Sequence, residues 1–176
     1  QINPENKDYK LQLASFYILG KKREEARRRI DTVLSESPDN IPALYLNISL
    51  MALDNEPSRT MIEKYEHILA IDTVQPRAHM ALSQLFARQK DMEKTETHLK
   101  MAVSQAPKNI AYANSLYRYY LLRRQPEDAR SVVETLISQV PGKAQPLVLL
   151  GNFFMSQKQG VEAEKTYLQA IDTEPD

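Results

Sequence analysis

Residues 144–175 read AQPLVLLGNFFMSQKQGVEAEKTYLQAIDTEP, and this stretch decides the fold. It carries small residues at Gly151 and Ala163 and aromatic residues at Phe154 and Tyr167. Two antiparallel helices approach closely only where a small side chain lies at their crossing, while larger rings fill the space beside it. The stretch therefore predicts one helical hairpin whose two helices touch near Gly151 and Ala163.

The proline that ends this stretch recurs along the chain. Pro107, Pro141 and Pro175 are evenly spaced, and Pro4 and Pro38 are separated by the same interval. The separation of Pro38 from Pro107 is two such intervals plus one residue. Because a proline cannot continue a helix, each of them predicts a helix end. A regular period of about 34 residues predicts an array of helical hairpins.

The last unit resembles the tetratricopeptide repeat (TPR) signature. The matching slots are Leu150, Gly151, Phe154, Ala163, Tyr167, Ala170 and Pro175, and the departure is Leu147, where the family favours Trp. Earlier units align in phase, so we divide the chain into repeats 7–40, 41–75, 76–109, 110–143 and 144–176, with residues 1–6 as the end of a preceding repeat. Pentatricopeptide, half-a-TPR and Sel1-like repeats are the alternatives.

The resemblance implies an all-α fold, a right-handed α-solenoid of about five antiparallel helix-turn-helix repeats that extends over residues 1–176 as a single domain. No polar capping helix is visible at either end, so we expect an internal fragment of a longer array. Leu168 and Ile171 of the last helix would then be partly uncovered. We expect self-association through these uncapped ends.

Two units depart from the pattern. Tyr117 occupies the small-residue slot of the fourth unit, where a ring should force the hairpin apart or turn outward. In the second unit, Met61 replaces the small residue that opens the second helix. The extra residue of this unit lies near Ile41 or in the turn 54–58. To allow for it, we expect the groove-lining positions of this unit one residue later than in the other units.

The composition excludes several classes of function. The chain has 176 residues, 23 of them basic and 23 acidic, and no cysteine. Zero net charge argues against a dedicated binder of nucleic acid or of anionic membranes. The lack of cysteine removes disulfides and thiolate metal sites. No apolar run approaches the roughly 20 residues that span a bilayer, so we expect no membrane insertion in this segment. The compartment, cytoplasm or periplasm, stays open.

We expect neither an enzyme nor a cofactor or metal site. The three histidines, His67, His79 and His98, fall in three different predicted helices, and Glu63 with His67 is an ordinary i,i+4 surface pair. No glycine-rich phosphate loop and no catalytic triad spacing is present.

Two clusters could indicate nucleic-acid binding. Residues 21–29 are rich in Lys and Arg, but Glu24 and Glu25 stand four residues before Arg28 and Arg29, as in paired helix faces. In the second cluster, around Tyr117–Tyr120, rings alternate with cations as they do in single-strand binders. Tyr120 occupies a core slot, so only Tyr119 and Tyr117 are left to stack on bases. We interpret both clusters as structural.

In TPR arrays the first helix of each repeat, here called the A helix, lines a concave groove. The resemblance therefore implies a partner-binding groove formed by Leu46, Leu50, Arg77, Met80, Gln84, Arg88, Asn114, Arg118, Asn152 and Met155. Arg can hold a carboxylate through two hydrogen bonds, Asn and Gln can pair with a peptide backbone, and Met tolerates varied apolar side chains. The paired Lys and Asn with which some TPR domains clamp chaperone tails are not reproduced.

We therefore predict a protein-interaction scaffold that binds an extended peptide or partner protein of acidic character. Two alternatives are a structural spacer or assembly segment of a larger protein and an RNA-binding helical repeat. The style of the repeats is similar to long bacterial TPR proteins, including envelope lipoproteins linked to surface-polymer export.

Overall fold

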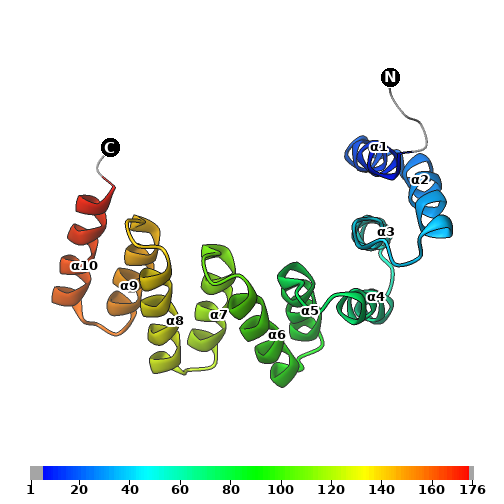
Figure 1. The fold of residues 1–176 in the computed structure, drawn as a ribbon. Helices are drawn as coiled ribbons and strands as arrows, with labels where there is room; N and C mark the ends of the chain where they lie inside the picture. Colours follow the sequence, from blue (N-terminus) through cyan, green and yellow to red (C-terminus); the bar gives the residue numbers. More distant parts are fainter. Residues whose placement is uncertain (1–5, 175–176) are drawn as a thin grey trace. The chain divides into compact units, whose positions relative to one another are not determined.

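The computed structural model describes residues 6–174, in which ten helices and no strands are present (Figure 1). The helices are α1 (Lys7–Leu19), α2 (Arg23–Glu36), α3 (Ile41–Leu53), α4 (Ser58–Ile71), α5 (Pro76–Arg88), α6 (Met92–Gln105), α7 (Ile110–Leu122), α8 (Pro126–Gln139), α9 (Ala144–Ser156) and α10 (Gly160–Thr173). The predicted all-α class is therefore confirmed.

The odd-numbered helices are the A helices and the even-numbered helices are the B helices. The A helices begin at residues 7, 41, 76, 110 and 144, the first residues of the five expected repeats. Pro4, Pro175 and most of the expected preceding repeat in residues 1–6 lie outside the described residues. Asn6 caps α1, because its side chain accepts a hydrogen bond from the backbone N–H of Asp8.

The chain divides into two compact units. The first unit comprises the described residues up to Ala78, and the second comprises those from His79 onward. Ala78 lies within α5, so the start of α5 belongs to the first unit and its remainder to the second.

Every A helix ends in the same tight turn. In α1 the N–H of Lys21 donates to the carbonyl of Ile18, and the N–H of Lys22 donates to the carbonyl of Tyr17. This pair of bonds is the Schellman motif, which needs a left-handed residue after the helix. That residue has a φ of 56° to 62° in all five turns and is Lys21, Asn55, Lys90, Arg124 or Lys158. The left-handed residue reverses the chain into the B helix.

The extra residue of the second repeat lies in the turn between α3 and α4. This turn has four residues, 54–57, whereas the other A-to-B turns have three. Helix α3 begins one regular period after α1, just as α9 follows α7, so no insertion lies near Ile41. Our displacement of the groove slots in this repeat by one residue was therefore wrong.

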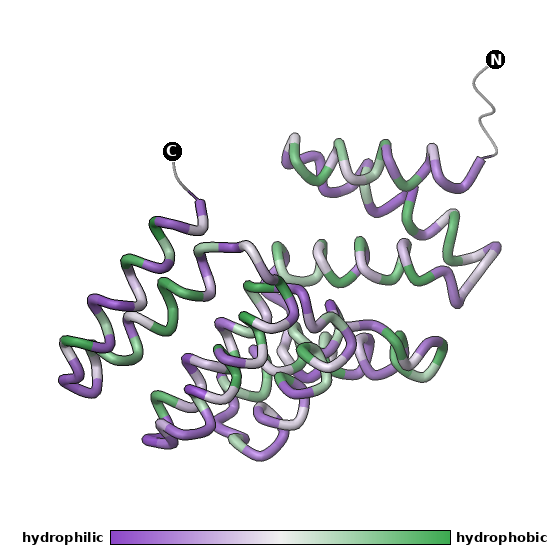
Figure 2. The backbone as a smooth tube through the Cα atoms, turned by 60° about the vertical axis from the view of Figure 1, so that its left-hand side comes forward, coloured by the Kyte–Doolittle hydropathy of each residue, from purple (hydrophilic) through white to green (hydrophobic). Residues whose placement is uncertain are grey.

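The core of the first unit consists of small residues interleaved with branched ones. Ala14 of α1 and Ala26 of α2 are fully buried against Ile30, and Leu50 of α3 packs on all three. A second cluster joins Leu11, Val33 and Ala43. Figure 2 shows the corresponding alternation of hydrophobic and hydrophilic residues along the helices. Helix α3 thus buries one face against the hairpin formed by α1 and α2.

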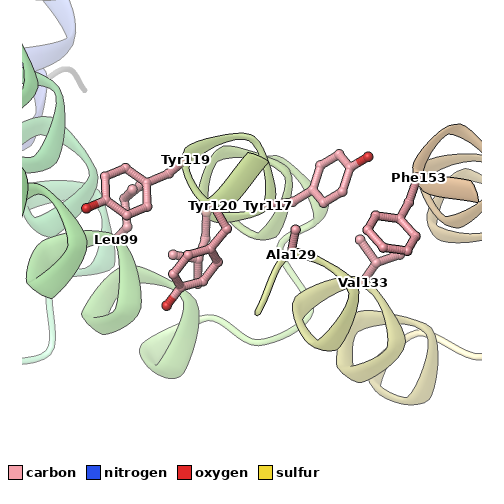
Figure 3. Packing of buried hydrophobic residues seen from close by; sticks show 8 residues of the cluster. Leu99, Tyr117, Tyr119, Tyr120, Ala129, Val133 and Phe153 are labelled. Carbon is pink, nitrogen blue, oxygen red and sulfur yellow. The ribbon is translucent and has the colours of Figure 1, made fainter. Parts of the chain in front are cut away.

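The core of the second unit contains the three tyrosines of α7. Tyr119 and Leu99 lie on one side of α7, and Tyr117 points to the opposite side, toward the helix that carries Phe153 (Figure 3). Tyr117 is 5% exposed. The expectation that its ring turns outward was therefore wrong. Tyr117 packs in the same buried cluster as Val133 of α8 and Phe153 of α9.

Candidate functional site

The first unit has an open hollow of about 580 Å³ on its A-helix face. We call it the first hollow. Its lining comes from α1, from α3 and from the start of α5, and consists of Asp8, Leu11, Gln12, Ser15, Ile41, Pro42, Tyr45, Leu46 and Arg77. An apolar floor with a few polar groups at its edge is the usual composition of a ligand site.

Arg77 is the cationic group of the first hollow. Its guanidinium carbon lies 4.5 Å from the centre of the Tyr45 ring, within the range of a cation–π contact. The Tyr45 hydroxyl donates to the side-chain oxygen of Gln75 at 3.2 Å, and the Gln75 amide donates to Asp72 at 2.7 Å. Burial raises the pKa of the neighbouring Tyr65, and the charge of Arg77 opposes that rise. The ring of Tyr45 therefore holds Arg77 over the hollow.

The second unit has a hollow of about 270 Å³ on its own A-helix face, here called the second hollow. It is lined by Met80, Ser83, Gln84, Ala87, Thr95, Leu99, Ser115, Arg118, Tyr119 and Leu122. Arg118 is exposed and forms no ion pair with any described residue. Leu122 is 84% exposed, so apolar surface lies beside an uncompensated positive charge.

Half of the predicted groove residues line these hollows. Leu46 and Arg77 lie in the first hollow, and Met80, Gln84 and Arg118 lie in the second.

The other predicted residues are placed differently. Leu50 is fully buried in the hairpin core, so it packs the repeat and offers nothing to a partner. Asn152 is exposed, and its side-chain oxygen accepts a hydrogen bond of 2.8 Å from Tyr167. Arg88, Asn114 and Met155 line neither hollow.

Two lining residues were missed because of the displaced register. Pro42 and Tyr45 are the slots that follow Asp8 and Leu11 by one regular period, without displacement. The equal spacing of the two helix starts would have identified both of them.

A histidine pair was also missed. His79 of α5 and His98 of α6 lie with their Nδ1 atoms 2.9 Å apart, and the His98 ring stacks on Phe86. Burial, with the positive charges of His79 and Lys94, lowers the pKa of His98 to about 4. Contacts between neighbouring helices bring the two rings together, and no spacing in the sequence reveals it. His67 instead faces Asp39, with 3.2 Å between His67 Nε2 and Asp39 Oδ1.

Two arginines of the basic cluster at residues 21–29 have a structural role. Arg23 and Arg27 both bind the carboxylate of Asp54, at the end of α3. The pairs expected for Glu24 and Glu25 are not formed among the described side chains.

The tyrosines of α7 are buried as well. Tyr117, Tyr119 and Tyr120 are each at most 8% exposed. The interpretation of this cluster as structural is therefore confirmed, and Tyr117 and Tyr119 are not free to stack on bases.

Within residues 6–174, no group of three or more His, Cys, Asp or Glu side chains could hold a metal ion. None of the helices in this range is both long enough and apolar enough to cross a membrane.

No family model matches the sequence, and no curated protein matches it either. Solved structures do match. PilF from Pseudomonas aeruginosa superposes with a TM-score of 0.71 at 18% identity, over 97% of this chain and 77% of PilF. MamA from Desulfovibrio magneticus RS-1 gives a TM-score of 0.69 at 14% identity, over 96% of this chain and 95% of MamA.

A third matching structure is described as a TPR protein. YrrB, described as a TPR protein with an unusual peptide-binding site, superposes with a TM-score of 0.63 at 16% identity, over 99% of this chain and 89% of YrrB. This chain has the TPR fold. The TPR hairpins account for the small residues at Ala14, Ala26, Gly151 and Ala163, all of which are buried where helices cross.

Proposed function

We propose that this chain is a protein-interaction scaffold that binds extended segments of a partner protein on its A helices. The first and second hollows are the two contact points. The partner segment carries Asp, Glu or a free C-terminus, and apolar residues stand beside the acidic group.

The observation that carries the proposal is the composition of the hollows. Each of them combines one exposed arginine with apolar wall residues, Leu11 and Leu46 in the first hollow and Met80 and Leu122 in the second. Neither Arg77 nor Arg118 forms an ion pair with a described residue. A guanidinium without a carboxylate partner favours an acidic ligand, since Arg and carboxylate form paired, charge-assisted hydrogen bonds.

The position of Arg77 also favours binding. A long arginine side chain loses rotational freedom when a ligand fixes it, which costs roughly 0.5–1.5 kcal/mol. The contact with Tyr45 already restricts the Arg77 side chain, so less of this cost falls on the binding step. Asp8 in the same hollow adds specificity, because its carboxylate repels a second acidic group of the partner.

Two further points support the proposal. YrrB, which has a similar fold, is described as having a peptide-binding site. The RNA-binding alternative has lost its stacking platform, because Tyr117 and Tyr119 are buried. Single-strand binders need exposed rings on which successive bases can stack.

An array of extended peptides tests the proposal. The peptides vary in Asp and Glu content, in apolar content, and in whether the C-terminus is free or amidated. We expect the chain to retain acidic peptides with adjacent apolar residues. Arg77→Glu and Arg118→Glu should each weaken binding about tenfold or more, which corresponds to roughly 1.4 kcal/mol.

The matched control is Arg28→Glu. Arg28 is an exposed arginine of α2 that lines neither hollow, so its reversal changes the net charge equally. If neither the wild-type chain nor the control retains any peptide, the spacer alternative takes the place of the scaffold. If binding falls equally in all three variants, the effect is one of net charge and the hollows are not the site.

A further inference from the structure

The first hollow holds two opposite charges that do not pair with each other. Asp8 and Arg77 both line it, and neither forms an ion pair with any residue in the range that the structure describes. Elsewhere in the same unit a carboxylate is bound by arginines, since Asp54 pairs with both Arg23 and Arg27. The two charges of the first hollow are therefore available to a ligand.

These charges occupy the same position in two different repeats. Asp8 is the second residue of α1, Pro42 is the second residue of α3, and Arg77 is the second residue of α5. Helix α3 packs on α1, and its Tyr45 contacts Arg77. The three positions therefore form a row across the helices, with a carboxylate at one end, an apolar ring in the middle and a guanidinium at the other end.

The wall beside the two charges is suited to a peptide. Leu11 and Leu46 give it an apolar floor. Gln12 and Ser15 of α1 also line the hollow, and neither side chain has a hydrogen-bond partner in the described part of the chain. Amide and hydroxyl groups can pair with the backbone of an extended peptide. The first hollow thus offers charge contacts at two sides, an apolar contact, and hydrogen bonds for the main chain.

The spacing of the helices sets the spacing of the ligand's charges. The axes of packed helices lie about 8–10 Å apart, so α1 and the start of α5, on either side of α3, are about 16–20 Å apart. Both charged side chains reach into the hollow, which shortens the distance between their charged groups. In an extended peptide, side chains on one face recur every two residues, so residues four apart are separated by about 13 Å. A basic and an acidic residue four apart, with an apolar residue midway, therefore fit the row.

We propose that the first hollow binds an extended peptide with a Lys or Arg, an apolar residue and an Asp or Glu at alternate positions. The basic side chain pairs with Asp8 and the acidic side chain pairs with Arg77. The apolar residue lies over Leu11 and Leu46. This inference rests on the proposed scaffold function and adds a basic residue to what the partner segment must carry.

Asp8 also has a structural role that a test must separate from binding. It lies in the first turn of α1, where the partial positive charge of the helix N-terminus favours a carboxylate. That role stabilises the helix whether or not a ligand is present. Only pairing with a peptide makes the effect of replacing Asp8 depend on the charge of that peptide.

Isothermal titration calorimetry with four synthetic peptides tests the proposal. The parent peptide has Lys, Leu and Glu at alternate positions, with Ser between them. In the other three peptides, Gln replaces the Lys, the Glu or both. The chains titrated are the wild type, Asp8→Asn, Arg77→Gln and two controls, Asp31→Asn and Arg28→Gln. Asp31 and Arg28 are exposed residues of α2 that line neither hollow. Thermal unfolding verifies that every chain is folded.

We expect the parent peptide to bind the wild type and both controls with equal affinity. Asp8→Asn should weaken binding of the parent peptide about three- to tenfold and should leave the affinity for the peptide without Lys unchanged. Arg77→Gln should likewise weaken binding of the parent peptide and leave the affinity for the peptide without Glu unchanged. Replacement of either peptide charge should cost the wild type a similar factor.

Three results would overturn the proposal. If Asp8→Asn weakens the parent peptide and the peptide without Lys equally, Asp8 has only its structural role. If the wild type binds these two peptides equally, the partner needs no basic residue; acidic peptides still bind through Arg77 in both cases, so the scaffold proposal stands. If the wild type binds none of the four peptides, the inference and the acidic-peptide proposal fail together.

Discussion

The ring of Tyr167 in α10 lies so close to Gly151 in α9 that a Cβ atom on residue 151 would overlap it. One repeat earlier, the equivalent residues are Tyr117 and Val133, so the large and the small side chain have exchanged helices. Both pairs fill the crossing of a hairpin with one large residue and one smaller one. The total volume at the crossing is therefore what the fold requires, and the identity of each slot is secondary.

The first prediction concerns this pair. In a helix, Ala is favoured over Gly by about 1 kcal/mol. The overlap with Tyr167 should cost about 1–3 kcal/mol, so Gly151→Ala should destabilise the chain or leave it unchanged. In a Tyr167→Val background the overlap is gone, and Gly151→Ala should stabilise by about 1 kcal/mol. A double-mutant cycle by urea unfolding measures the coupling, and additive effects would contradict the proposed contact.

The second prediction concerns Ala163, which is buried opposite Gly151 in the same hairpin. Ala163→Leu inserts three carbons into a filled crossing and should destabilise by roughly 1–3 kcal/mol. Ala70→Leu in α4 is the control, because Ala70 is exposed. Thermal unfolding that shows equal stability for the two variants would mean that the assigned register is wrong.

The third prediction concerns the turns after the A helices. Lys158 has a φ of 62°, a conformation that β-branched residues avoid. Lys158→Val should destabilise by about 1–2 kcal/mol, whereas Lys158→Gly should cause no loss. Urea midpoints compare both variants with Lys165→Val, a change at an exposed position within α10. A Lys158→Val midpoint equal to that of the control would rule out strain in this turn.

The fourth prediction concerns pH. The pKa of His98 is lowered from 6.5 to about 4 in the folded chain, first by burial and then by the charges of His79 and Lys94. Between these two values the unfolded chain binds a proton at His98 that the folded chain excludes. The contribution of neutral His98 to the free energy of unfolding should therefore be fully present above pH 6.5. It should be lost as the pH decreases toward 4. Urea midpoints across this range measure the loss.

The control for the pH effect is His98→Phe, which keeps a ring against Phe86 and removes the titration. In this variant the decline in stability between pH 6.5 and 4 should be smaller than in the wild type. An identical decline in both chains would assign the pH dependence to other groups.

The sequence predicts the helices well because each hairpin repeats the same local signals. Small residues such as Ala26 and Ala163 and the closing prolines recur at a fixed period, and these signals depend only on nearby residues. The assignment of Pro42 and Tyr45 to the first hollow depends on where the extra residue of the second repeat lies. The spacing of the prolines alone did not locate that residue.

Other features depend on contacts between helices. Tyr117 is buried in a cluster that also contains Val133 and Phe153, and a prediction from one helix at a time overlooks such neighbours. The pairing of His79 with His98 likewise arises only when α5 and α6 pack together. The sequence therefore predicts the repeat better than the surface that the repeat presents.

The most direct test of the scaffold proposal is amide chemical-shift mapping with a peptide selected from the array. We expect the shifts to change at residues lining the hollows, such as Leu11, Tyr45 and Arg77 in the first and Gln84 and Arg118 in the second. We also expect Arg77→Glu and Arg118→Glu to reduce the changes in their own hollow at the same peptide concentration. Shift changes confined to the B helices, or none at all in the presence of bound peptide, would contradict the account.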